Sequence, residues 1–203
     1  IMLAHYSNVV FTNERTAVVD MAQYCNRNAY YWQHALDPEK HHPEATEGDI
    51  EGLANVPAHD VVFVGTGWEE RCALLEAVDW TGIDFGLYGS WGLLGSRNKL
   101  RQHIKGGVID NRLTAAMYRK AKIGINLHRT SVTWGRGVDH IERAESMNPR
   151  CYELAANGCF FLTDYRAEVG EVFGDAVPTF ETPQELEQLI RYYLAHDQER
   201  QAK

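Results

Sequence analysis

The sequence predicts an α/β fold in which a parallel sheet carries helices on both faces. From Asp60 onward, short apolar segments alternate with segments of helical periodicity, which is the pattern of repeated strand–helix–strand units. The first two predicted strands each end at a glycine, Gly65 and Gly89. The last helix carries a clear start signal, with Thr182 as N-cap and Pro183 at its first position.

The predicted elements of this region follow one another at short intervals. We expect strands at residues 60–64, 84–88, 123–127, 159–163 and 176–180, and helices up to about Val78 and at 112–121, 149–157, 167–173 and 182–196. Ligands of open parallel sheets bind outside the carboxyl ends of the strands, near the point where the strand order reverses. The residues that follow Val64, Tyr88, Leu127 and Thr163 are therefore the candidates for a site.

The first 44 residues predict a separate strand–helix–strand piece. Its strands are expected at 9–11 and 29–36 and its helix at 14–24. The segment 37–57 changes to proline, histidine, acidic and small residues, which is typical of a linker. The chain begins Ile1-Met2 and stops inside an apparent helix, so we expect a fragment, or the ordered part of a longer protein.

Composition narrows the function classes. A formal charge of −8 and a pI of about 5.6 argue against binding to a nucleic-acid backbone. No signal peptide and no apolar run of about 20 residues is visible, so neither secretion nor a membrane span is predicted. His41-His42 lacks a third ligand at metal spacing and no HExxH motif occurs, so we predict no metal site.

The cysteines predict a reducing compartment. None of Cys25, Cys72, Cys151 and Cys159 belongs to a CxxC pair, and the last three fall in apolar segments. We expect buried, reduced thiols in a cytoplasmic protein. The aromatic runs 30–32 and 192–193 are expected to be packing residues.

The first candidate site is the turn Gly65-Thr66-Gly67 with Arg71 behind it. A glycine turn between a strand and a helix N-terminus presents free N–H groups to an anion, and Arg71 could supply the countercharge. A plain tight turn, with Arg71 paired to a surface carboxylate, is equally open. The turn is not a full GxGxxG fingerprint, and Tyr88 stands where a nicotinamide-binding domain carries an acidic residue, so that function is disfavoured.

The second candidate site is the segment Glu145-Ser-Met-Asn-Pro-Arg-Cys-Tyr-Glu153. Asn148 suits a helix cap, and Arg150 adds positive charge where a diphosphate would sit. Glu153 lies inside the helix and Glu145 before it, so the two carboxylates could converge on one ligand. The alternative is a solvated helix face.

A third group ends the predicted strand 123–127. Asn126 and His128 stand at the end of this strand, and the imidazole of His128 could bind a phosphate or a sugar hydroxyl. A structural histidine at a strand end is the alternative. The long loop 129–144 contains Gly135 and Gly137 and fits either a lid or a disordered segment.

Two runs carry a family resemblance. They are Tyr118-Arg-Lys-Ala-Lys-Ile-Gly-Ile-Asn-Leu-His128 and Asn148-Pro-Arg-Cys-Tyr-Glu-Leu-Ala-Ala-Asn-Gly-Cys-Phe-Phe-Leu-Thr163. With the ending Glu171-Val-Phe-Gly-Asp, they resemble the C-terminal domain of the CgeB-like (spore maturation protein-like) branch of GT-B glycosyltransferases. The resemblance extends from about Val9 to Arg200, and it implies three parts. These are residues 1–44 as the end of the N-terminal, acceptor-side domain, 45–58 as a linker, and 59–203 as a Rossmann-like domain that binds a nucleotide sugar.

The resemblance implies a metal-independent transferase that needs no cofactor. Its partners would be a nucleotide-diphosphate sugar, an unknown acceptor and the missing N-terminal domain. Glu145 would be the catalytic contact to the donor sugar, Glu153 would bind the ribose and Arg71 the diphosphate. Ile109 and Asp110 would border the base. The donor site would be completed by Gly65, Thr66, Gly67, Asn126, His128, Asn148 and Arg150. A non-catalytic nucleotide-binding or structural module with the same fold remains the alternative.

Overall fold

The computed structural model describes residues 7–24, 27–44, 56–130 and 144–203. Its main part is a six-stranded sheet in the order β5-β4-β3-β6-β7-β8, and every neighbouring pair is parallel. The strands are β3 (Val61–Val64), β4 (Phe85–Tyr88), β5 (Ile104–Gly106), β6 (Ile123–Asn126), β7 (Phe161–Asp164) and β8 (Thr179–Phe180). After the edge strand β5 the chain returns to the middle of the sheet as β6, beside β3, so the strand order reverses between the central strands β3 and β6. The predicted α/β fold is confirmed.

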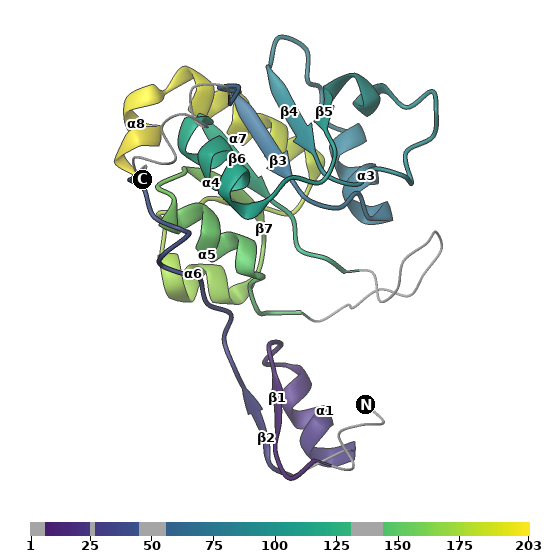
Figure 1. Cartoon of the computed structure of the whole chain (residues 1–203), viewed down its shortest axis with the longest axis vertical. Coiled ribbons are helices and arrows are strands. Elements are labelled where there is room, and N and C mark those ends of the chain that lie inside the picture. Colours follow the sequence, from purple (N-terminus) through teal and green to yellow (C-terminus); the bar gives the residue numbers. More distant parts are fainter. Residues whose placement is uncertain (1–6, 25–26, 45–55, 131–143) are drawn as a thin grey trace.

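Helices cover both faces of this sheet (Figure 1). One face packs against α3 (Glu69–Glu76), α7 (Pro183–Ala195) and the 3₁₀ helix η2 (Lys99–His103). The other packs against α4 (Asn111–Lys120), α5 (Pro149–Ala156) and α6 (Ala167–Phe173). A short α8 (Asp197–Ala202) follows α7.

The central strand β3 shows why the sheet needs both layers. Val61 and Phe63 belong to one hydrophobic cluster, Val62 and Val64 to the other, and all four are buried. Successive side chains of a strand point to opposite faces, so a continuous apolar run requires cover on both.

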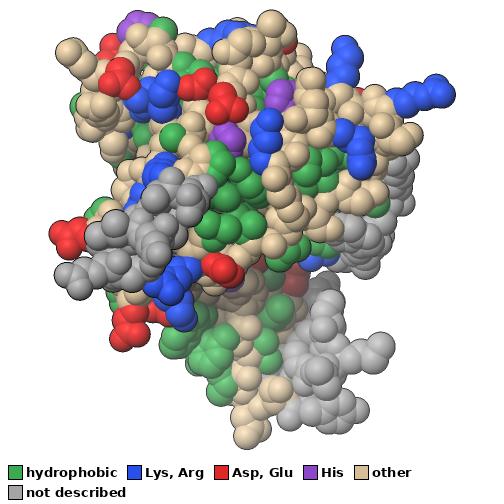
Figure 2. All heavy atoms as spheres, turned by 45° about the horizontal axis from the view of Figure 1, so that its top comes forward, with side chains coloured by type: hydrophobic (Ala, Val, Ile, Leu, Met, Phe, Trp, Pro, Cys, Tyr) green, Lys and Arg blue, Asp and Glu red, His purple; other side chains and the backbone are tan. Residues whose placement is uncertain are grey.

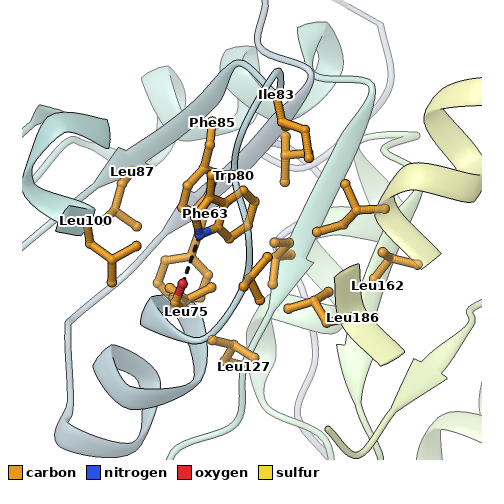
Figure 3. Packing of buried hydrophobic residues seen from close by; sticks show 14 of the residues in the cluster. Phe63, Leu75, Trp80, Ile83, Phe85, Leu87, Leu100, Leu127, Leu162 and Leu186 are labelled. Carbon is orange, nitrogen blue, oxygen red and sulfur yellow. Dashed lines mark hydrogen bonds between the residues drawn. The ribbon is translucent and has the colours of Figure 1, made fainter. Parts of the chain in front are cut away.

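Figure 3 shows the first of these clusters. Trp80 stacks on Phe85 with ring centroids 3.7 Å apart, and its indole N–H donates to the Leu75 carbonyl at 2.8 Å. The stacked pair closes the layer between α3 and the sheet without leaving the buried indole N–H unsatisfied.

A second, smaller unit precedes the domain. The parallel strands β1 (Val10–Thr12) and β2 (Ala29–Tyr31) are joined by α1 (Ala17–Tyr24), which confirms the predicted strand–helix–strand piece. This N-terminal unit lies below α5 and α6 in Figure 1 and is connected to the domain by an extended segment. β2 ends at Tyr31, not near residue 36 as expected. Most of the predicted linker, residues 45–55, lies outside the described residues.

Three further differences from the expected elements have local causes. β5 and η2 were not predicted, because the short edge strand Ile104-Lys105-Gly106 shows no apolar run. β8 begins only at Thr179, since Pro178 has no N–H to donate to a strand partner. Tyr30 and Trp32, expected as packing residues, are exposed.

No helix in the described part of the chain is both long and apolar enough to cross a membrane.

Candidate functional site

A pocket of about 320 Å³ lies where the strand order reverses. We call it the switch-point pocket, since the carboxyl ends of β3 and β6 form its floor and the start of α5 its wall. It collects seven of the twelve residues expected at the site, and its lining consists of Phe63, Val64, Gly65, Thr66, Arg71, Asn126, Leu127, Asn148, Pro149, Arg150 and Glu153.

The glycine turn after β3 does not work as expected. The Gly65 N–H donates to the Tyr88 carbonyl at 3.0 Å and the Gly67 N–H to the Ser90 carbonyl at 2.8 Å. Both N–H groups are thus used to join this turn to the one after β4, and the expected row of free donors is absent at these two positions. A Cβ on Gly67 would lie 2.3 Å from the Trp91 ring, so Gly67 lets two neighbouring turns approach closely.

Arg71 spans the switch point. Its guanidinium donates to the carbonyl of Thr66 at 3.1 Å and, through the other terminal nitrogen, to the carbonyl of Leu127. The alternative of a surface carboxylate partner is wrong, because both acceptors are backbone carbonyls. Burial lowers the pKa of Arg71 to about 10, so the side chain is still cationic at neutral pH. A partly buried positive charge therefore lies in the pocket wall.

The start of α5 places one more cation and a carboxylate in the pocket. The Asn148 side chain accepts from the Cys151 N–H at 3.3 Å and caps the helix, and Pro149 occupies the first turn, as expected. Arg150 donates to a Glu153 oxygen at 2.6 Å, and its guanidinium lies 5.6 Å from the ring centre of Tyr118. The pair is mostly buried, which fixes both charged groups in position.

Asn126 lines the pocket but has structural partners. Its side-chain amide donates to the Thr163 hydroxyl at 2.9 Å and lies 3.1 Å from the Cys151 sulfur. With an exposed fraction of 1%, it ties β6 to β7 and α5.

His128 faces a different cavity. Its backbone N–H and its Nδ1 both lie within hydrogen-bonding distance of one Asp164 oxygen, at 2.9 and 2.7 Å. Burial alone would raise the pKa of Asp164, but the hydrogen bonds from His128 and the charge of Arg166 outweigh it and lower that pKa. Sequence reasoning missed Asp164, although it directly follows Thr163, one of the strand ends singled out.

Cys151, His128 and Asp164 are neighbours in that order, like the nucleophile, base and carboxylate of a catalytic triad. The sulfur lies 3.9 Å from His128 Nε2, but burial raises the pKa of Cys151 to about 12. A thiol that stays protonated and is fully buried is not an activated nucleophile. Cys72, Cys151 and Cys159 are buried and free, as expected, and Cys25 lies outside the described residues.

Four expected site residues do not line the switch-point pocket, besides His128. Glu145 is half-exposed and pairs with Arg15 of the N-terminal unit at 2.7 Å, so its expected convergence with Glu153 on one ligand is not seen. Asp110 caps α4 by accepting from the Leu113 N–H at 2.8 Å, while Ile109 packs against the core. Gly67 packs against Trp91, as described above. Of the loop expected as a lid, residues 131–143 lie outside the described residues.

A family model described as glycosyl transferase-like matches residues 50–203, which is about three quarters of the chain. No curated protein matches the sequence. The match covers all the strands and helices that build the switch-point pocket.

Three solved structures are similar to all or nearly all of this chain. HepE of Anabaena, determined with UDP and glucose, has a TM-score of 0.61 at 16% identity, covering 100% of this chain and 57% of that one. Sucrose-phosphate synthase from Thermosynechococcus elongatus has a TM-score of 0.60 at 14% identity, covering 96% and 51%. A glycosyltransferase from Rickettsia africae has a TM-score of 0.57 at 14% identity, covering 96% and 57%.

The present chain thus spans little more than half the length of these proteins. At such low identity the likeness establishes the fold, which is the Rossmann-like domain of GT-B enzymes. With the family match over residues 50–203, the chain belongs to the glycosyl transferase-like family.

Proposed function

We propose that the chain forms the donor-binding half of a glycosyltransferase that transfers a sugar from a nucleotide-diphosphate sugar to an acceptor. The observation that carries the proposal is the switch-point pocket, in which Arg71, Arg150 and Glu153 line one cavity in a glycosyl transferase-like fold. Two cations suit a diphosphate, and a carboxylate suits the hydroxyls of a ribose.

These residues would act by electrostatic stabilisation. When the glycosidic bond breaks, negative charge develops on the diphosphate, and guanidinium groups held in a partly buried wall stabilise that charge more than they would in water. Arg71 is fixed by two carbonyls and Arg150 by Glu153, so neither needs to reorganise during the reaction. We propose that this set of residues acts without a metal ion.

UDP is the first nucleotide to test. HepE was determined with UDP and glucose, and the match covers 100% of the present chain and 57% of HepE. The CgeB-like branch, suggested by the run from Asn148 to Thr163, remains our narrower family assignment.

We further propose that the acceptor site and the general base belong to a partner domain. The matched structures are nearly twice as long as this chain, and the N-terminal unit at residues 7–44 is the piece we assign to that domain. The buried free thiols of Cys72, Cys151 and Cys159 support a reducing, cytoplasmic location.

A non-catalytic binding module is the second candidate. It is favoured by the position of Glu145, whose carboxylate pairs with Arg15 and does not line the pocket. A transferase that relied on Glu145 would have to break this pair, whereas a binding module would not.

Titration calorimetry with UDP, GDP, ADP and UDP-glucose tests the proposal. We expect saturable binding of one nucleotide that EDTA leaves unchanged, and a loss of about tenfold in Glu153→Gln, the usual effect of one charge-assisted hydrogen bond. Glu187→Gln is the matched control, because Glu187 also pairs with an arginine on its own helix but lies far from the pocket.

The outcomes separate the two candidates. Nucleotide binding with no hydrolysis or transfer of the sugar, even after the partner domain is supplied, would favour the binding module. A folded chain that binds no nucleotide would rule out both and favour a structural module with the same fold.

A further inference from the structure

A second cavity, of about 530 Å³, opens beside the switch-point pocket. We call it the outer pocket. It lies at the carboxyl ends of β6, β7 and β8, and it shares Arg71 and Leu127 with the switch-point pocket. Its lining consists of Glu70, Arg71, Leu74, Leu127, His128, Thr130, Asp164, Tyr165, Arg166, Phe180 and Glu181.

Arg71 forms the wall between the two pockets. Its guanidinium is anchored on the Leu127 carbonyl, and both residues face both cavities. A phosphate held by Arg71 in the switch-point pocket would therefore lie next to the entrance of the outer pocket. A group attached to the far side of that phosphate would have the outer pocket as an adjoining cavity.

The lining of the outer pocket suits a neutral ligand rich in hydroxyl groups. Leu74, Leu127 and Phe180 provide apolar surface, while two arginines and three carboxylates stand among them. Carboxylates accept and guanidinium groups donate hydrogen bonds, so together they satisfy hydroxyls without favouring a net charge. Tyr165, 53% exposed, adds an aromatic ring and a hydroxyl to the lining.

Asp164 is the residue best prepared to bind such a ligand. His128 holds one of its oxygens with two hydrogen bonds, from the backbone N–H and from Nδ1. Within the described part of the chain, the other oxygen has only a long contact of 3.6 Å, to Arg166. One oxygen of Asp164 is thus held by His128, and the other can accept a hydrogen bond from a ligand.

We propose that the outer pocket holds the transferred sugar of the donor, with Asp164 accepting a hydrogen bond from a sugar hydroxyl. His128 is a positioning residue, because it acts by orienting Asp164. The inference rests on the proposed function and assigns its sugar subsite to residues other than Glu145, which pairs with Arg15 outside both pockets.

Saturation-transfer NMR with UDP-glucose on the full 203-residue chain tests the assignment, since ribose and glucose protons report separately on the two pockets. In the wild-type chain we expect saturation of both rings. In Asp164→Asn we expect the glucose signals to fall several-fold while the ribose signals remain. The affinity for UDP-glucose should fall about tenfold, with the affinity for UDP unchanged.

Matched variants separate sugar binding from a structural effect. His59 holds Asp84 at 3.0 Å, far from both pockets, so Asp84→Asn removes a similar His–Asp contact and should change neither ring. His128→Asn keeps a donor near the position of Nδ1 and should keep the glucose signal, whereas His128→Ala should lose it. If Asp164→Asn does not fold, the substitutions Tyr165→Ala and Glu181→Gln replace it. Both change exposed residues of the outer pocket, and both should lower the glucose signals.

Three outcomes would overturn the assignment alone: glucose protons that receive no saturation in the wild-type chain, loss of ribose and glucose signals together, or retention of both in every pocket variant. If the wild-type chain binds neither UDP nor UDP-glucose, the proposed donor site itself fails for this nucleotide.

Discussion

The six-stranded domain and the N-terminal unit are both built from parallel strands, yet they are stabilised in different ways. In the domain, all four residues of β3 are buried between two helical layers. In the N-terminal unit, Phe11 is 57% and Trp32 65% exposed, and these rings contact each other on an uncovered face. Figure 2 shows hydrophobic side chains at the surface of this lower unit. Parallel sheets need cover on both faces, and two strands alone cannot supply it.

Polar contacts take the place of that cover on the side facing the domain. Glu14 accepts from the N–H groups of Glu145 and Ser146, and Arg15 reaches Glu145 and Glu171. Tyr31 and Gln33 donate to the buried carboxylate of Glu168 in α6. The comparison teaches that the domain depends on apolar burial, and the docking of the N-terminal unit depends on a few carboxylates.

Truncating one side chain in each region should give the largest contrast. Leu162→Ala removes a fully buried side chain from β7 and should lower the free energy of unfolding by about 2–5 kcal/mol. Phe11→Ala removes a larger but exposed ring and should change it by no more than about 0.5 kcal/mol. Urea unfolding followed by circular dichroism measures both. A large loss in Phe11→Ala would mean that the exposed face is covered in solution, for example by a second copy.

Loss of the Glu168 carboxylate should undock the N-terminal unit. It should lower the free energy of unfolding by less than Leu162→Ala does. Glu168 is 3% exposed and accepts from Tyr31, Gln33 and the Met147 N–H, so an amide there turns an N–H toward one of these donors. We expect Glu168→Gln to cost about 1–3 kcal/mol. Hydrogen exchange of amides 10–31 should accelerate while the amides of β3 stay protected.

Glu171→Gln is the control for this variant. Glu171 lies on the same helix and also reaches the N-terminal unit, but its side chain is 58% exposed. An exposed ion pair contributes little, so exchange of the N-terminal amides should hardly change. Equal acceleration in both variants would show that burial of Glu168 is not what holds the unit.

Acid should weaken the docking of the N-terminal unit through Glu14. We expect this to be the smallest of the three effects. Burial raises the pKa of Glu14, but hydrogen bonds from Thr16, Glu145 and Ser146 lower it further than burial raises it, to below its ordinary 4.5. A carboxylate with a lowered pKa contributes fully above its unfolded value and loses that contribution as the pH falls toward the folded value. Docking should therefore be constant at neutral pH and weaken below about pH 4.5.

Amide chemical shifts of Glu145 and Ser146 during an acid titration measure this effect. Glu171, whose pKa is lowered by Arg15, titrates in the same direction, so some change is expected throughout the interface. Glu14→Gln should abolish the part seen at these two amides. A titration that is the same in the variant would assign the acid response to other groups.

Local signals predicted much of the fold and part of the site. The start of α5 could be read from Asn148-Pro149, because a cap and a first-turn proline act within a few residues of their own position. The position of Arg150 and Glu153 in this helix singled them out, the resemblance of the surrounding run supported both, and the structure places them in the pocket. The edge strand β5 escaped prediction because three residues with one glycine carry too little pattern.

The misplaced residues share a physical cause. Glu145 stood at a suggestive spacing from Glu153, but its partner Arg15 is 130 positions away in the sequence. The N–H groups of Gly65 and Gly67 looked free, and the chain supplies acceptors for them from the next strand's turn. Which donors and acceptors meet is decided by strand order, and no local pattern records it.

By itself, the sequence determined an α/β domain of alternating strands and helices, the caps that begin its helices, and the segment around Glu153 as the place to look for a donor site. The first two properties follow from periodicity and from contacts within one turn of helix or strand, and the donor site follows from the family resemblance of the run 148–163. Only the tertiary structure decided that Arg71 spans β3 and β6, that His128 orients Asp164, and that a second pocket adjoins the first. These features depend on parallel strands that bring residues 36 or more positions apart to one edge of the sheet, where their charges and hydrogen bonds act together.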